Sequence, residues 1–62
     1  MRVLVAEDFE IYARAIATGL RRAGRAVDVA LDGDEALQSL AVTRYDVVVL
    51  DRDLPEIGRA HV

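Results

Sequence analysis

The stretch that most constrains the fold is a short apolar run that ends on two carboxylates. Val47 to Leu50 is β-branched at three of its four positions and shows no polar alternation. This pattern favours a strand covered on both faces, as in a parallel sheet between helices. The run leads directly into Asp51 and Asp53, with Pro55 closing the motif. Because ligands of open α/β sheets collect outside the carboxyl ends of the strands, Asp51 is the candidate around which a site would form.

A second apolar run, Arg2 to Ala6, also ends on two acids, Glu7 and Asp8. The apolar residues then adopt a spacing of three and four, which is the period of one helix face. The residues of this stripe are Phe9, Ala13, Ile16, Ala17, Leu20 and Ala23. The pattern predicts a buried strand followed by a helix that packs through the stripe and stops at Gly24.

The next two elements are shorter. Residues 25–30 alternate only partly between apolar and polar, which favours a strand at the edge of the sheet. Asp32 can then cap a helix by accepting a hydrogen bond from the backbone three residues on. The buried stripe expected for this helix is Ala36, Leu37, Leu40 and Ala41. The helix should end near Val42, before Tyr45 leads into the strand at Val47.

The predicted fold class is α/β, because the order strand, helix, strand, helix, strand makes two successive βαβ units. Crossovers between parallel strands are right-handed almost without exception. The two acid-tipped strands are the most apolar, so we expect them to be neighbours at the centre, with parallel strand order 2-1-3. This order would bring Glu7, Asp8, Asp51 and Asp53 to one end of the sheet.

Each acidic pair also has a purely structural interpretation. Glu7 and Asp8 could serve the start of the next helix, and Asp51 and Asp53 could form an Asx-type turn stiffened by proline. Together, however, two neighbouring strands that end in carboxylates would repel by roughly 3 kcal/mol at about 5 Å and an effective dielectric of about 20. A divalent cation relieves this repulsion, and Mg²⁺ prefers one or two carboxylates with waters. The cluster therefore predicts a magnesium site.

A carboxylate beside such a cation can also act as a nucleophile towards phosphorus and form an acyl phosphate. Asp51 is the better candidate acceptor, because it ends the more continuous buried strand. Asp8 lies at a helix start and is better suited to holding the metal.

Composition excludes several other classes. Sixty-two residues allow one domain at most, and the net charge of −3 argues against a nucleic-acid surface within this segment. The chain has no cysteine and no apolar run near the ~20 residues of a membrane helix, so we expect a cytoplasmic location without membrane contact. We also expect so short a chain to fold poorly alone, with residues 47–50 an uncovered, aggregation-prone edge.

Three segments, residues 1–8, 27–37 and 45–55, resemble the receiver domain of bacterial two-component response regulators. The sequence of these segments is most similar to that of actinobacterial regulators that carry a winged-helix DNA-binding domain. The resemblance implies a truncated flavodoxin-like receiver fold in which Asp51 accepts a phosphoryl group from a sensor histidine kinase. It further implies that Mg²⁺ is held by Glu7, Asp8, Asp51 and the backbone carbonyl of Asp53.

The chain also departs from this family. A receiver is about twice as long, so residues 1–55 are expected to be its N-terminal half, without the dimerisation face and without the C-terminal domain through which DNA would be bound. Residues 56–62 do not follow the family pattern, and we predict that this tail is a sequencing or assembly artefact in which His61 is no ligand. The first helix offers Ile11, Arg14, Ala15 and Thr18 as candidate kinase contacts, although a solvated face is the simpler interpretation.

Two alternatives remain open. A phosphatase of the haloacid dehalogenase type would use Asp51 as nucleophile and Asp53 as acid/base, although Pro55 replaces the threonine or valine of that motif. A receiver-shaped interaction domain would not be phosphorylated, although the acids at the metal and acceptor positions are intact. Nucleotide binding is less consistent with the sequence, which has neither a G-x-G-x-x-G nor a P-loop motif.

Overall fold

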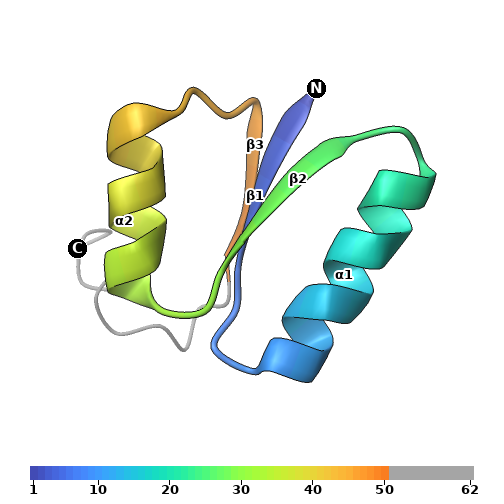
Figure 1. Cartoon of the computed structure of the whole chain (residues 1–62), viewed down its shortest axis with the longest axis horizontal. Coiled ribbons are helices and arrows are strands. Elements are labelled where there is room, and N and C mark those ends of the chain that lie inside the picture. The colour runs from blue at the N-terminus through green and yellow to red at the C-terminus, as the bar shows by residue number, and fades with distance from the viewer. Residues whose placement is uncertain (51–62) are drawn as a thin grey trace.

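In the computed structural model, which describes residues 1–50, five elements alternate between strand and helix (Figure 1). They are β1 (Arg2–Ala6), α1 (Glu10–Arg22), β2 (Ala26–Ala30), α2 (Gly33–Val42) and β3 (Val47–Leu50). The order of the elements is the one predicted from the sequence. The remaining residues, 51–62, lie outside the described part of the chain.

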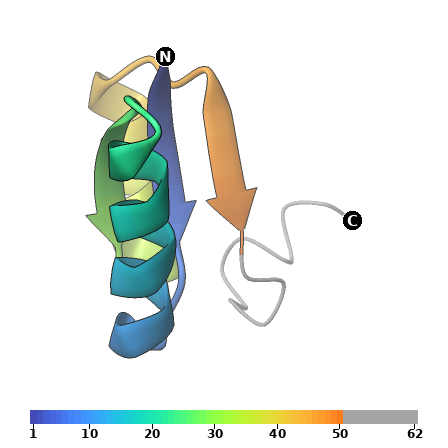
Figure 2. The same cartoon turned by 90° about the vertical axis from the view of Figure 1, so that its right-hand side faces the viewer.

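The three strands form one parallel sheet in the order β2-β1-β3, which confirms the predicted order. At the carboxyl end of β1, Ala6 pairs with Ala30 on one side and with Leu50 on the other. The helices α1 and α2 lie on opposite faces of this sheet (Figures 1 and 2). The result is a three-layer α/β arrangement with β1 in the middle of the sheet.

Alternating side chains of β1 supply the centres of two small cores. On the α1 face, Val3 and Val5 pack with Ala13 and Ala17 of the helix. On the α2 face, Leu4 and Ala6 pack with Ala30 and Ala36. The central strand is therefore buried on both faces, as its uninterrupted apolar sequence predicted.

The predicted stripe of α1 is only partly buried. Ala13 and Ala17 are fully buried, whereas Phe9 is 53 % exposed and precedes the first helical residue. Phe9 instead contacts Tyr12, with ring centroids 4.8 Å apart, and Tyr12 is exposed as well. The expectation that Phe9 belongs to the buried stripe is wrong, because α1 meets the sheet through alanines and the two rings pack on each other instead.

The stripe of α2 shows the same limit, since Ala36 is buried but Leu37, Leu40 and Ala41 are exposed. Within residues 1–50, both helices lie over β1 and β2, and β3 adds only Val48 and Val49 to the margins of the two cores. Figure 2 shows β3 standing to one side of both helices. Val47 and Leu50 remain about 40 % exposed, so the uncovered apolar edge expected from the sequence is present.

Local signals set the helix ends as predicted. Gly24 follows α1 with φ of +86°, and the N–H groups of Gly24 and Arg25 donate to the carbonyls of Arg21 and Leu20, which is a Schellman motif. Asp32 caps α2 by accepting from the Glu35 N–H at 2.7 Å. The helices have 13 and 10 residues, and neither of these two described helices has the length and apolarity needed to cross a bilayer.

Candidate functional site at the carboxyl end of the sheet

The register between β1 and β3 sets where the predicted site residues leave the sheet. Ala6 pairs with Leu50, so both strands end at the same level and at the same edge. Glu7 follows Ala6 in the sequence, and Asp51 follows Leu50. Asp51 and Asp53 lie outside the described residues, so their approach to Glu7 and Asp8 stays a prediction.

Glu7 is fixed by bonds on both its backbone and its side chain. Its N–H donates to the carbonyl of Ala30 at 3.0 Å, which extends the pairing with β2 by one residue beyond β1. Its carboxylate oxygen Oε1 accepts from the N–H of Phe9 at 3.0 Å. This carboxylate therefore helps to satisfy the backbone at the start of α1, which is the structural role considered for it in the sequence.

The adjacent Asp8 is exposed at the same turn. Neighbouring carboxylates are the hard oxygen donors that Mg²⁺ takes, usually one or two together with waters. Glu7 and Asp8 are thus suitable ligands for the Mg²⁺ of the predicted site. Residues 1–50 contain no group of three or more potential metal ligands, and the other predicted donors, from Asp51 and Asp53, are not among the described residues.

A second polar cluster, which the sequence did not reveal, lies at the opposite, amino end of the sheet. The Tyr45 hydroxyl donates to Asp28 Oδ2 at 2.6 Å, and Arg2 Nη1 donates to the same oxygen at 3.2 Å. The hydrogen bond from Tyr45 is the main reason that the pKa of Asp28 is lowered, with Arg2 adding to the effect and desolvation opposing it. The same bond raises the pKa of Tyr45.

Asp46 belongs to the same cluster and forms two hydrogen bonds with Arg2. Its N–H donates to the carbonyl of Arg2 at 2.9 Å, and its carboxylate accepts from the Arg2 N–H at 2.8 Å. The start of β3 is thereby attached to the start of β1. Arg2 and Asp46 are 44 positions apart, so no local spacing in the sequence predicts their contact. The only signal is that both residues border apolar runs that are expected to form neighbouring strands.

The response regulator receiver domain family matches residues 3–58 of this chain. The chain belongs to this family. The resemblance noted in the sequence is thus confirmed, and the match runs three residues past the predicted boundary at residue 55. The interpretation of residues 56–62 as a tail outside the family stays a prediction.

Individual relatives of this receiver domain are named transcriptional regulators. The transcriptional regulatory protein CutR of Streptomyces coelicolor is 64 % identical over 55 residues, which cover 89 % of this chain and 25 % of CutR. PrrA of Mycobacterium leprae, another transcriptional regulatory protein, is 43 % identical over 61 residues, covering 98 % of this chain and 26 % of PrrA. The chain therefore spans about a quarter of the length of these relatives.

A solved structure supports the fold. The receiver domain of the Francisella response regulator 1452 superposes with a TM-score of 0.83 at 41 % identity. The superposition covers 87 % of this chain and 45 % of that one. The α/β architecture with strand order β2-β1-β3 is thus that of a receiver domain.

Proposed function

We propose that this receiver domain is the phosphoacceptor module of a two-component system and that Asp51 takes the phosphoryl group. The observation that supports this most directly is the register of Ala6 with Leu50, because it ends β1 and β3 at one edge of the sheet. The acids that follow these two strands in the sequence, Glu7, Asp8 and Asp51, are the residue types that phosphoryl transfer to a carboxylate requires.

In the proposed reaction, a carboxylate oxygen of Asp51 attacks the phosphorus of a phosphohistidine in a sensor kinase. The O–P bond forms, the P–N bond breaks and the imidazole leaves, which gives an acyl phosphate on Asp51. Glu7, Asp8, Asp51 and the backbone carbonyl of Asp53 would hold Mg²⁺. When bound, the ion neutralises charge on the transferring phosphoryl oxygens. The phosphoryl group stays on Asp51 after the transfer, so we propose that the domain acts as a signalling acceptor and not as an enzyme.

The proposed partners follow from the family and from the exposed surface of α1. Ile11, Arg14, Ala15 and Thr18 are all exposed on this helix, as contact with a kinase requires. Because relatives are named transcriptional regulatory proteins, we propose that phosphorylation controls DNA binding by a domain outside this chain. Such a system would operate in the cytoplasm.

The test is incubation of the 62-residue chain with acetyl phosphate and Mg²⁺, followed by mass spectrometry. We expect a base-labile gain of one phosphoryl group that disappears in Asp51→Asn and on removal of Mg²⁺ by a chelator. The matched control is Asp53→Asn, which should still be labelled because only the backbone of Asp53 is proposed to act.

Two results would contradict the proposal. Labelling that survives Asp51→Asn would place the acceptor elsewhere. Steady hydrolysis of a phosphoester that is lost in both aspartate variants would instead indicate the haloacid dehalogenase chemistry.

A further inference from the structure

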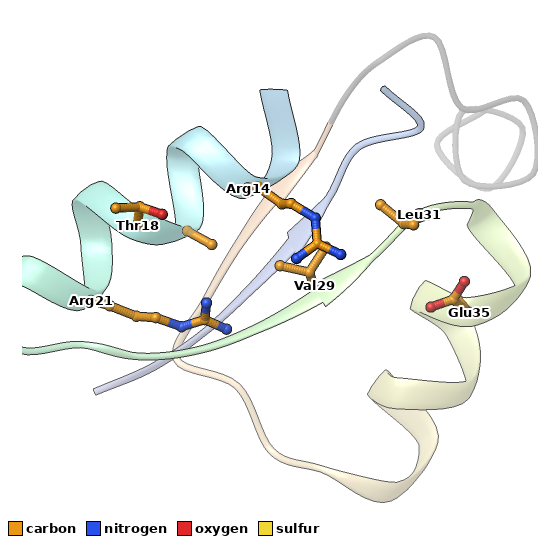
Figure 3. A pocket seen from close by; sticks show the side chains of 7 residues that line it. Arg14, Thr18, Arg21, Val29, Leu31 and Glu35 are labelled. Atoms are coloured by element: carbon orange, nitrogen blue, oxygen red, sulfur yellow. The ribbon is translucent and has the colours of Figure 1, made fainter. Parts of the chain in front are cut away.

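A groove lies between α1, the carboxyl end of β2 and the first turn of α2 (Figure 3). Its volume is about 330 Å³. The apolar lining residues are Ala17, Val29 and Leu31, and the polar ones are Arg14, Thr18, Arg21 and Glu35. None of the acids of the candidate phosphorylation site lines it. The groove is therefore distinct from the candidate phosphorylation site, although Arg14 and Thr18 also belong to the surface proposed for the kinase.

The side chains that line this groove include more positive than negative charges, whereas the whole chain is negative. The chain carries a net charge of −3, yet two guanidinium groups and one carboxylate line the groove. Figure 3 shows the side chains of Arg14 and Arg21 extending from α1 toward β2, while Glu35 approaches from α2. Arg14 is paired with Glu10 beside the groove, so Arg21 is the lining guanidinium that has no ion pair among residues 1–50 and lies over an apolar floor.

Both guanidinium groups are already positioned by hydrogen bonds within the chain. Arg21 donates through Nη2 to the carbonyl of Val27 at 2.8 Å in a partly buried contact. Arg14 donates through Nε to Glu10 at 2.7 Å, and its Nη2 lies 2.6 Å from the same carboxylate oxygen in an exposed ion pair. A guanidinium has five N–H donors, so each group keeps donors that no acceptor in residues 1–50 occupies. Fixing the side chains in advance lowers the entropic cost of binding a ligand.

We propose that this groove binds a small ligand in which a carboxylate or phosphate is attached to an apolar body. The oxyanion would lie beside Arg21, with Arg14 at the edge of the groove, since planar guanidinium groups can form charge-assisted hydrogen bonds. The apolar body would contact Val29 and Leu31, which are half-buried. The volume is at the lower end of the range for small-molecule pockets, about 300–1,000 Å³, which limits the body to about one ring.

Glu35 allows a test in which a substitution should strengthen binding. Its carboxylate would repel a bound oxyanion, so its charge works against the arginines. Removal of this charge should strengthen binding, whereas removal of the Arg21 charge should weaken it. A surface that attracts anions only through the net charge of the chain would respond equally to any arginine.

The experiment uses the complete 62-residue chain labelled with ¹⁵N and titrated with four probes. Phenyl phosphate and benzoate carry both an oxyanion and a ring, inorganic phosphate lacks the ring, and benzyl alcohol lacks the charge. We expect phenyl phosphate or benzoate to shift the amide signals of Ala17, Val29 and Leu31. Comparison of these two probes identifies which oxyanion the groove prefers, and the other two probes should bind more weakly.

Three variants test which residues carry the binding. Arg21→Met should weaken it about tenfold, since one charge-assisted hydrogen bond is lost. Arg22→Met is the matched control, because Arg22 is exposed on the same turn but does not line the groove, and it should bind as the parent does. Glu35→Gln should bind more tightly and keeps the test decisive if Arg21→Met fails to fold.

Three outcomes would overturn the proposal. Equal weakening in Arg21→Met and Arg22→Met would indicate a general charge effect. Unchanged or weaker binding in Glu35→Gln would remove the proposed arrangement of charges. Signals that shift only outside the groove, or equal shifts with benzyl alcohol, would show that the two arginines hold no oxyanion there.

Discussion

The hydroxyl of Tyr45 donates a 2.6 Å hydrogen bond to the carboxylate of Asp28, joining the two outer strands of the sheet. Asp28 belongs to β2, Tyr45 lies just before β3, and β1 runs between these strands. Arg2 of β1 donates to the same carboxylate oxygen. A single carboxylate in the middle of β2 therefore binds the amino end of β1 and the residue that leads into β3.

Replacement of the Tyr45 hydroxyl should destabilise the fold. Tyr45→Phe keeps the ring that packs beside Leu4 but removes the hydrogen bond to a charged acceptor, and we expect a loss of about 1–2 kcal/mol because Asp28 is partly exposed. The measurement is the free energy of unfolding in urea. Tyr12→Phe is the control, since Tyr12 is 60 % exposed, and should change stability by less than about 0.5 kcal/mol. Equal losses in the two variants would contradict the prediction.

The same pair should limit the pH range of stability. The pKa of Asp28 is lowered from its ordinary value of 3.8, so its contribution is present above that value and is lost as the pH falls through the lowered pKa. The pKa of Tyr45 is raised from 10.0, so its contribution is present below that value and is lost as the pH rises through the raised pKa.

The pH effect is measured as the difference in unfolding free energy between the parent chain and Tyr45→Phe/Asp28→Asn. Taking a difference removes the titration of the other acids. We expect a constant difference between about pH 5 and about pH 9 that shrinks toward both extremes. A difference that is independent of pH would show that the bond adds nothing to stability through these two groups.

Two glycines at the end of α1 should respond to alanine with opposite signs. Gly24 has a φ of +86°, which an alanine adopts only with strain, so Gly24→Ala should cost about 1 kcal/mol or more. Gly19 lies inside the helix and an added Cβ would meet nothing within 4 Å, so Gly19→Ala should stabilise by about 0.5–1 kcal/mol. Thermal and urea unfolding of the two variants would reveal the signs, and a shared sign would refute the argument.

The uncovered strand β3 should promote self-association of this chain. Val47 is 41 % exposed on an outer strand, and a lysine there should block pairing between sheet edges. We expect Val47→Lys to reduce the association seen by sedimentation velocity as concentration increases. Val42→Lys changes the net charge equally but lies on α2, where Val42 is 84 % exposed, so it should have little effect. Equal effects would attribute the association to charge.

The order of the elements, the strand order and the helix ends could be predicted from the sequence. These features have local signals: the change from an uninterrupted apolar run to a three-and-four spacing, Gly24 after α1, and Asp32 before α2. Strand order followed because the two most apolar strands were expected to be neighbours, and β1 does pair with β3. The motif around Asp51 likewise predicted the family.

Which apolar positions are covered, and which polar groups meet, became evident from the three-dimensional structure. Periodicity identifies the apolar face of a helix but not how much of that face meets the sheet. Leu37 and Leu40 remain exposed although they belong to the apolar face of α2, which lies over β1 and β2. The bond from Tyr45 to Asp28 and the groove beside Arg21 join segments whose approach depends on strand register and on how α1 lies over the sheet. Contacts of this kind are set by packing between distant segments, which no local pattern encodes.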